Sequence, residues 1–233
     1  MAFGNISQRT TPIVLNLIII NALVYLAQLA LGGGSDINSV TDLFALHHYK
    51  SAYFQPYQII THMFMHDQSS FFHLLFNMLG LWMFGTVIER LWRPKRFLIF
   101  YLICGVGAAL MQMGSYMVDF WQVDQANLSN EDYTQYQQIL RKNATVGASG
   151  AIMGVLAAFG YLFPDTKLFI MPIPFPIKAK WAIIGIIALD VFGGVVKVQG
   201  DNIAHFAHVG GALIGFLLVL YWNRNTPKEP MYY

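Results

Sequence analysis

Charged side chains are scarce in this chain. Only 11% of its 233 residues are Asp, Glu, Lys or Arg, whereas 56% are hydrophobic, and a soluble domain carries about 25% charged residues. The net charge is only +2, and no basic stripe runs along the sequence, so we expect no nucleic-acid partner. The single cysteine, Cys104, excludes a framework of internal disulfides. We expect it to be a small buried side chain.

The charges that are present leave five long stretches without any. These contain 26, 21, 22, 22 and 22 residues, after Arg9, Asp67, Arg96, Lys142 and Asp201 respectively. A helix needs about 20 apolar residues to cross a bilayer, so each stretch is long enough for one crossing. A sixth and weaker stretch, between Lys180 and Lys197, contains Asp190.

This pattern predicts an all-α polytopic membrane protein with six transmembrane helices. We expect residues 1–233 to form a single membrane domain, with spans at approximately 12–31, 70–89, 97–118, 147–163, 180–197 and 203–222. The first apolar run is too long for the core of a signal peptide, so we expect it to remain as an uncleaved anchor.

The basic residues favour one orientation of these helices. If the N-terminus is cytoplasmic, ten of the 14 Lys and Arg residues fall in inner segments and four in outer segments, as the positive-inside rule requires. We therefore expect an integral multi-pass protein with both termini in the cytoplasm, in the cytoplasmic (inner) membrane of a bacterium. The first outer loop, up to about Ser70, contains apolar pieces suited to the membrane interface. The second, Asp119 to Lys142, is polar, and we expect a solvated connector.

A serine and a histidine occupy positions where polar groups are costly. Ser149 lies in Gly147-Ala148-Ser149-Gly150 at the start of the fourth span, and His208 lies near the start of the sixth. The predicted orientation places both at a similar depth below the outer surface. Ionisable residues inside membrane spans indicate function by default. A serine beside a histidine has the residue types of a nucleophile and its general base.

Glycines follow each of these two residues at helical spacing. Gly150 and Gly154 follow the serine, and Gly211 and Gly215 follow the histidine. Small residues four positions apart let two membrane helices approach closely, so the fourth and sixth spans are predicted to pack together.

The second span contributes two more polar residues, His73 and Asn77, which share a helix face because they are four positions apart. Side-chain donors of this kind can stabilise a developing oxyanion. They can equally form interhelical hydrogen bonds that hold a bundle together. Spacing alone leaves both readings open.

Together these motifs resemble the rhomboid intramembrane serine proteases. The resemblance runs from about Thr61 to Gly215 and rests on His73-Leu74-Leu75-Phe76-Asn77, on the glycine-flanked Ser149, and on Ala207-His208 with its two glycines. It implies a six-transmembrane-helix rhomboid bundle, a Ser-His dyad without a third acid, and a water-filled cavity open to the outer face.

The resemblance also implies a role for each residue. Ser149 would be the nucleophile and His208 the general base, while His73, Asn77 and the Ser149 backbone N–H would form the oxyanion site. The implied activity is endopeptidic cleavage of transmembrane segments near the outer face, with transmembrane protein substrates in the lipid bilayer as partners and without a cofactor or metal.

Two features depart from the family pattern. Many relatives have an aromatic residue four positions after the nucleophile, stacked on the base, whereas this chain has Met153. Some relatives carry a Trp-Arg pair in the first outer loop, where this chain has Tyr57-Gln58.

Several alternatives stay open. For Asp190 three roles stay open: a third triad member, a solvated acid, or one partner of an interhelical pair. His62, His66 and His205 lie near one surface but lack HExxH or CxxC spacing for a metal. A catalytically idle rhomboid-like protein that binds transmembrane clients is the alternative function, although such relatives usually lose the serine or the histidine. A transporter would require internal repeats, which we do not find.

Overall fold

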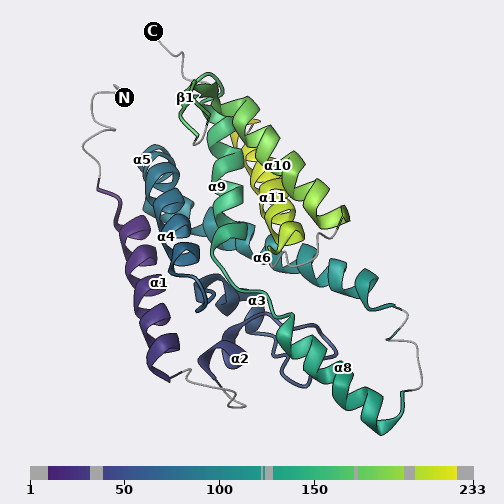
Figure 1. The fold of residues 1–233 in the computed structure, drawn as a ribbon. Helices are drawn as coiled ribbons and strands as arrows, with labels where there is room; N and C mark the ends of the chain where they lie inside the picture. The colour runs from purple at the N-terminus through teal and green to yellow at the C-terminus, as the bar shows by residue number, and fades with distance from the viewer. Residues whose placement is uncertain are drawn as a thin grey trace.

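The computed structural model describes residues 10–31, 39–121, 123, 128–170, 173–196 and 203–224. Five of its helices are long and apolar enough to cross a membrane: α1 (Pro12–Leu31), the helix Phe71–Trp92, α6 (Pro94–Asp119), α10 (Ala179–Val196) and α11 (His205–Arg224). A sixth apolar helix, α9 (Ser149–Leu162), is shorter and lies between the others (Figure 1). The predicted fold class, an all-α polytopic membrane protein with a six-helix bundle, is confirmed.

The second of these helices contains a change of winding. It begins as α4 (Phe71–Gly80), passes through a single π-helical segment, η3 (Leu81–Gly85), and ends as α5 (Thr86–Trp92). It extends three residues beyond the predicted span. The third span begins three residues earlier than predicted, because Pro94 suits the first turn of α6. Only Arg93, with φ 71°, separates the two helices.

The remaining elements are short. The first loop, between α1 and α4, contains α2 (Val40–Phe44), α3 (Gln58–Thr61) and the 3₁₀ turn η2 (His62–Phe64). The second loop, between α6 and α9, contains α8 (Asn130–Lys142). Between α9 and α10, strands β1 (Lys167–Leu168) and β2 (Ile177–Lys178) pair antiparallel, with Lys167 opposite Lys178.

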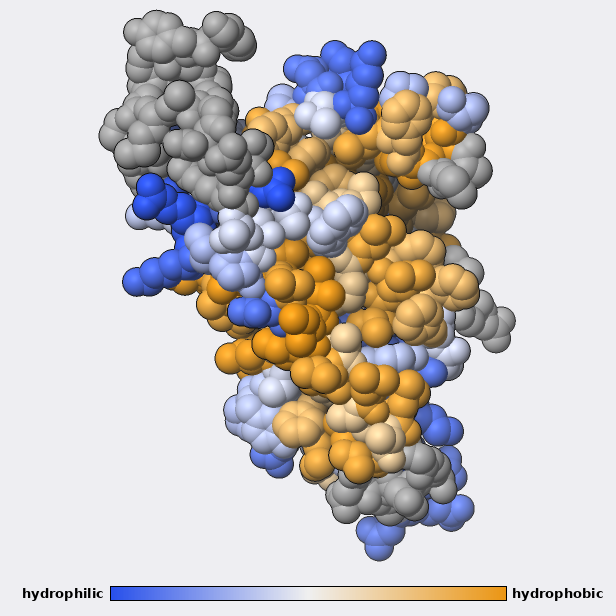
Figure 2. Space-filling model, turned by 90° about the vertical axis from the view of Figure 1, so that its left-hand side faces the viewer, coloured by the Kyte–Doolittle hydropathy of each residue, from blue (hydrophilic) through white to orange (hydrophobic). Residues whose placement is uncertain are grey.

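The outer surface of the bundle carries large apolar side chains. Leu23, Leu26, Phe72, Phe76 and Trp82 are all more than half exposed. Figure 2 shows hydrophobic side chains gathered across the middle of one face and hydrophilic ones towards both ends. An apolar band with polar ends is the surface that a bilayer requires, because lipid tails solvate apolar groups. The chain is a multi-pass membrane protein.

Helix α9 packs against α6 and α11 at the centre of the bundle, where glycines permit backbone contact. A methyl group on Gly211 would overlap the carbonyl oxygen of Gly150, and one on Gly215 would lie 2.5 Å from the Cα atom of Gly154. On the other side, a methyl group on Gly150 would lie 2.5 Å from the Cβ atom of Ala108 in α6. The predicted packing of the fourth and sixth spans is therefore present.

A buried carboxylate holds α1 against the bundle. Glu89 of α5 is 1% exposed, and its two oxygens accept the backbone N–H groups of Ile13 (2.9 Å) and Val14 (2.8 Å). These groups have no acceptor within their own helix. A negative charge at a helix N-terminus is also favourable. Glu89 therefore caps the N-terminus of α1.

In its described residues 128–142, the second loop has more structure than the solvated connector that we predicted from its polar composition. Ser129 caps α8 by accepting the Asp132 N–H, and the helix buries Tyr136 and Leu140. Arg141 forms two hydrogen bonds with Asp42 in α2, from Nε to Oδ1 at 3.0 Å and from Nη2 to Oδ2 at 2.7 Å. The Gln/Asn-rich composition of this loop did not indicate the amphipathic helix, which packs against the first loop.

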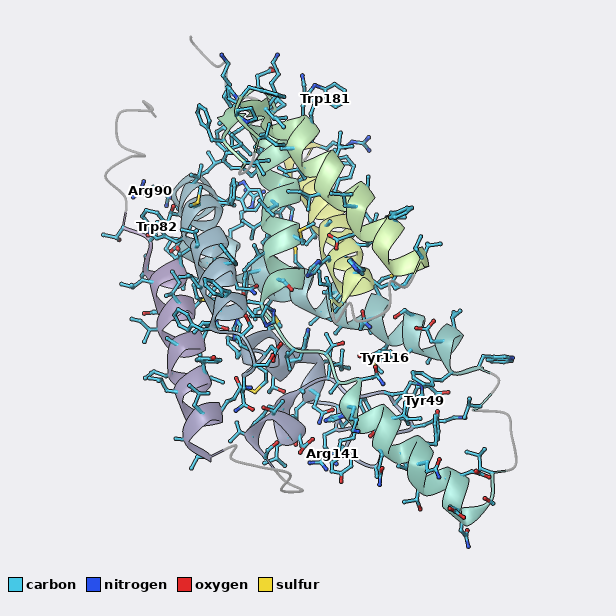
Figure 3. The ribbon with its side chains drawn as sticks, in the orientation of Figure 1. Tyr49, Trp82, Arg90, Tyr116, Arg141 and Trp181 are labelled. Atoms are coloured by element: carbon cyan, nitrogen blue, oxygen red, sulfur yellow. The ribbon has the colours of Figure 1, made fainter. Side chains whose placement is uncertain are left out.

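Tyr116 joins the end of α6 to this assembly (Figure 3). Its hydroxyl lies 2.6 Å from Thr145 Oγ1 and donates to the carbonyl of Asn143, just after α8. Thr145 in turn pairs through its backbone with Leu46 in the first loop. The segment that leads into α9 is thus fixed from both sides.

The glycine contact predicts the effect of one added methyl group. Gly211→Ala would push α11 away from α9, because the obstructing atom is a backbone oxygen that cannot rotate aside. We expect a loss of about 1–3 kcal/mol in stability, measured as a lower midpoint of thermal unfolding in detergent. Gly185→Ala on α10 meets nothing within 4 Å and is the control. Equal midpoints for the two variants would contradict the packing account.

The Asp42–Arg141 pair predicts a pH-dependent contribution to stability. Burial tends to raise the pKa of Asp42, but hydrogen bonds from Arg141 and Ser39 outweigh it, and the pKa lies below its ordinary value of 3.8. Because the pKa is lowered by folding, the stabilisation is present at neutral pH. It disappears as the pH falls through the lowered pKa of the folded protein. Arg141→Gln should cost about 1 kcal/mol at neutral pH.

The measurement is the midpoint of thermal unfolding at neutral pH and at successively lower pH values below 3.8, where the deficit of Arg141→Gln should shrink as Asp42 takes up a proton. Lys142→Gln, which removes a neighbouring exposed charge, is the control. A deficit of the same size at both pH values would show that the guanidinium packs rather than pairs.

Candidate active site

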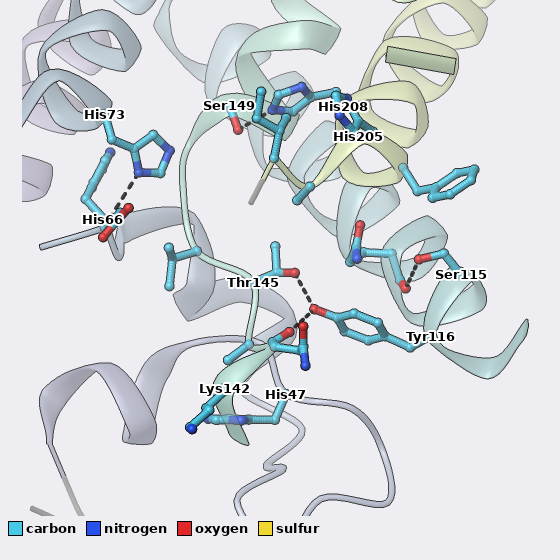
Figure 4. Close-up of a pocket in the computed structure, with 18 of the residues that line it drawn as sticks. His47, His66, His73, Ser115, Tyr116, Lys142, Thr145, Ser149, His205 and His208 are labelled. Carbon is cyan, nitrogen blue, oxygen red and sulfur yellow. Dashed lines mark hydrogen bonds between the residues drawn. The ribbon is translucent and has the colours of Figure 1, made fainter. Parts of the chain in front are cut away.

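The bundle brings the predicted serine and histidine into contact. Ser149 is the first residue of α9, and His208 lies one turn into α11. The Ser149 Oγ and His208 Nε2 atoms are 2.8 Å apart, a hydrogen-bond distance (Figure 4). Both side chains are partly exposed rather than sealed in the core. Residues 59 positions apart in sequence thus meet because α9 and α11 pack through their glycines.

The turn before the serine depends on Gly147. This residue has φ 126°, which an L side chain rarely adopts, and its N–H donates to the carbonyl of His62 at 3.0 Å. A methyl group here would lie 3.1 Å from the His73 ring and 3.5 Å from Ser149 Oγ. The absence of a side chain therefore leaves a narrow space between the serine and His73.

The start of α11 is also fixed. Gln112 of α6 accepts the Ala207 N–H through Oε1 at 3.2 Å. The N–H of His208 donates to the carbonyl of Ala204 at 3.2 Å. A buried amide on the neighbouring helix thus satisfies a backbone donor of the first turn, and it sets the depth of the histidine.

Asp190 of α10 lies on the other side of the histidine. Its Oδ1 atom is 2.9 Å from His208 Nδ1 and 2.8 Å from His205 Nδ1, and the residue is 7% exposed. A carboxylate only accepts hydrogen bonds, so His208 Nδ1 carries a proton and donates. In the neutral form of this ring, Nε2 carries no proton and can accept the hydroxyl of Ser149.

His73 and Asn77 on α4 line the same cavity as this pair. His73 Nδ1 accepts the Asp67 N–H at 3.1 Å, so a neutral His73 carries its proton on Nε2. Nε2 and its neighbour Cε1 are the ring atoms nearest to Gly147. Asn77 donates one amide hydrogen to the carbonyl of His73 at 2.7 Å and keeps a second. The two predicted donors therefore share one face of α4, and His73 lies beside the serine.

The Ser149 N–H adds a third donor. It belongs to the first turn of α9, where N–H groups have no acceptor within the helix and the helix dipole favours negative charge. Of the predicted donors, His73 lies next to the space that Gly147 leaves open, and Asn77 lines the same cavity.

A cavity of about 1020 Å³ extends from this site to the first and second loops. Its lining includes Ser149, His208, His73 and Asn77 at one end and Asp42 and Arg141 at the other. Polar groups line much of it, so water can enter. The site is a polar pocket within an apolar bundle.

The sequence also drew attention to His62, His66, Cys104 and Met153. Burial lowers the pKa of both His62 and His66 to about 4, so both rings are neutral at physiological pH. Among the described residues, no three His, Cys, Asp or Glu side chains are placed to hold one metal ion. Cys104 is fully buried, as predicted. Met153 packs with Ala212 and Ile186 rather than facing the cavity.

Sequence reasoning missed the residues that orient the site. It weighed Asp190 as a triad member but could not choose, because the face that α10 turns inward depends on its packing. Gln112 and the carbonyl of His62 gave no signal at all, since one is a lone amide in an apolar run and the other is backbone. Only the assembled bundle shows what they do.

The fold and this site define a multi-pass helical membrane protein with a serine–histidine pair at a polar cavity. The Rhomboid domain matches residues 53–225 of the chain, about three quarters of its length. The chain therefore belongs to the rhomboid family.

Individual relatives agree with this assignment. The chain is 29% identical over 171 residues to Rhomboid protein 1, mitochondrial, of Saccharomyces cerevisiae, covering 73% of this chain and 43% of that protein. It is 32% identical over 161 residues to Rhomboid protease AarA of Providencia stuartii, covering 67% and 52%. It is 32% identical over 165 residues to human Presenilin-associated rhomboid-like protein, mitochondrial, covering 68% and 38%. The aligned part spans about half or less of each relative.

Proposed function

We propose that this protein is an intramembrane serine endopeptidase that cleaves transmembrane segments of membrane proteins near the outer face. Ser149 is the nucleophile and His208 the general base. The observation that carries the proposal is the 2.8 Å contact between Ser149 Oγ and His208 Nε2 at a polar cavity within an apolar bundle. Rhomboid proteases among the relatives support the reaction class.

The chemistry follows from the proton positions. His208 Nε2 takes the hydroxyl proton as Ser149 Oγ attacks the scissile carbonyl, and it then gives that proton to the leaving amine. A water molecule from the cavity attacks the acyl-enzyme in the same way and releases the second product. The histidine must start neutral, with its proton on Nδ1, and the contact with Asp190 favours that tautomer.

The oxyanion is stabilised by His73, Asn77 and the Ser149 backbone N–H. His73 presents Nε2–H because its Nδ1 is occupied by the Asp67 N–H, and Asn77 has a second amide hydrogen. Preorganised donors of this kind stabilise the charge that develops in the transition state.

The position of the serine limits the substrate. Its helix begins at the end of the bundle where the outer loops lie, so the scissile bond must reach that depth in an extended form. A stable helix hides its carbonyls in i→i−4 hydrogen bonds, and freeing them in lipid is costly. Substrates are single-span proteins whose helices contain Gly, Pro or other small residues near the outer end, because these residues weaken the helix.

A catalytically idle rhomboid-like protein that binds transmembrane clients is the alternative. The hydrogen-bonded serine and histidine favour the enzyme, since binding alone requires neither residue in that geometry.

The first test concerns the nucleophile and base. Ser149→Ala and His208→Ala should each abolish cleavage of a single-span test substrate in reconstituted vesicles, because an unassisted serine is a poor nucleophile. The unfolding midpoint should stay near that of the native protein, which would show that the variants fold. Cleavage at the native rate by either variant would exclude this mechanism.

The second test concerns the oxyanion donors. His73→Ala and Asn77→Ala should each lower kcat by roughly 10- to 1000-fold with little change in KM, since the donors act on charge that is absent from the ground state. The assay is steady-state cleavage at varied substrate density in the vesicles. A raised KM at unchanged kcat would instead assign the two residues to substrate binding.

The third test concerns orientation. We propose that both termini are cytoplasmic in a bacterial inner membrane, as the basic residues suggest. Cysteine introduced by Gln135→Cys on the exposed face of α8 should react with an impermeant maleimide in intact cells, whereas Thr166→Cys should react only after lysis. The native Cys104 is buried and gives the background. The reverse pattern would place the site at the cytoplasmic face.

A further inference from the structure

Asp190 is an ionisable residue in the middle of an apolar helix, where a charge is costly. Within the described part of α10 it is the one acidic residue. Its side chain is 9% exposed. One carboxylate oxygen lies within hydrogen-bond distance of the Nδ1 atoms of both His205 and His208. Such a group is retained only where it is paired, and here one of its partners is the proposed base.

The arrangement joins three helices through one chain of hydrogen bonds. Asp190 Oδ1 contacts His208 Nδ1 at 2.9 Å, and His208 Nε2 contacts Ser149 Oγ at 2.8 Å. The acid comes from α10, the histidine from α11 and the serine from α9. This order, acid to imidazole to hydroxyl, holds the ring in the tautomer that can accept the serine proton.

An apolar floor lies one helical turn below these three residues. Met153 is four positions after Ser149, Ala212 is four after His208, and Ile186 is four before Asp190 on the antiparallel α10. These three residues pack together. Hydrocarbon beneath the polar chain provides no competing hydrogen-bond partner for the imidazole, so its orientation depends on the carboxylate and the serine.

We propose that Asp190 is a positioning residue for His208, which orients the base of the Ser149–His208 dyad. The inference rests on the proposed function and deepens it. The carboxylate orients the imidazole and stabilises the imidazolium that forms when the serine proton moves, and it does not itself take that proton. His205 donates to the same oxygen and holds the carboxylate in place.

A purely structural role is the competing explanation, because Asp190 also ties α10 to α11. Glu89 is the matched comparison in this chain. It is another buried carboxylate that joins two helices, α5 and α1, through the backbone N–H groups of Ile13 and Val14, but it has no part in the site. Loss of a structural carboxylate should lower stability without affecting the reactivity of Ser149.

The test measures the rate at which a fluorophosphonate labels Ser149, which requires no substrate. The serine oxygen bonds to phosphorus, fluoride leaves, and His208 takes the hydroxyl proton. Asp190→Asn keeps the shape but removes the charge, and it should slow labelling by about 10- to 10⁴-fold. Asp190→Glu restores the charge and should recover part of the rate. Glu89→Gln should label within about twofold of the native rate while unfolding at a lower temperature.

The possible outcomes distinguish the proposed protease activity from the proposed role of Asp190. Native labelling without substrate cleavage would refute the proposed protease, while the labelling rates of the Asp190 variants would still decide the role of Asp190. Labelling of Asp190→Asn at the native rate would overturn the inference. A loss of labelling that merely parallels the fall in unfolding midpoint, as strong in Glu89→Gln as in Asp190→Asn, would also overturn it.

Discussion

The contact between the backbones of α9 and α11 is the constraint from which the site follows. Gly211 meets the carbonyl of Gly150, and Gly215 meets the Cα atom of Gly154. Lipid tails are as apolar as leucine side chains, so membrane helices gain little from the hydrophobic effect and associate through close packing instead. The same contact holds Ser149 and His208 at hydrogen-bond distance. The packing that stabilises the bundle therefore also assembles the candidate site.

Buried carboxylates complete what packing alone cannot specify. Glu89 satisfies the free N–H groups at the start of α1, and Asp190 occupies the Nδ1 side of His208. Each is costly to bury without partners, and each lies against donors that have no better acceptor. Outside the bundle, Asp42 and Arg141 fix α8 to the first loop, and both residues line the cavity of the candidate site.

Much of this architecture could be predicted from the sequence. Charge-free stretches located the helices, and small residues four positions apart identified the α9–α11 contact. The glycine-flanked Ser149 and His208 could be paired because both occupy the same end of their spans. The order of α8 was missed, since its buried face consists of only Tyr136 and Leu140 among polar neighbours. The partner of Asp190 was equally hidden, because it depends on the rotation of α10 about its axis. Contacts made by backbone groups, such as the His62 carbonyl with Gly147, leave no trace in residue types.

The most direct test of the central claim is to map a covalent adduct. The protein would be treated in membranes with a fluorophosphonate, and the site and stoichiometry would be determined by mass spectrometry of intact protein and peptides. The account predicts one adduct per chain, on Ser149, and a strong loss of that adduct in His208→Ala. An unreactive native protein, an adduct on another residue, or equal labelling of Ser149 without His208 would contradict it.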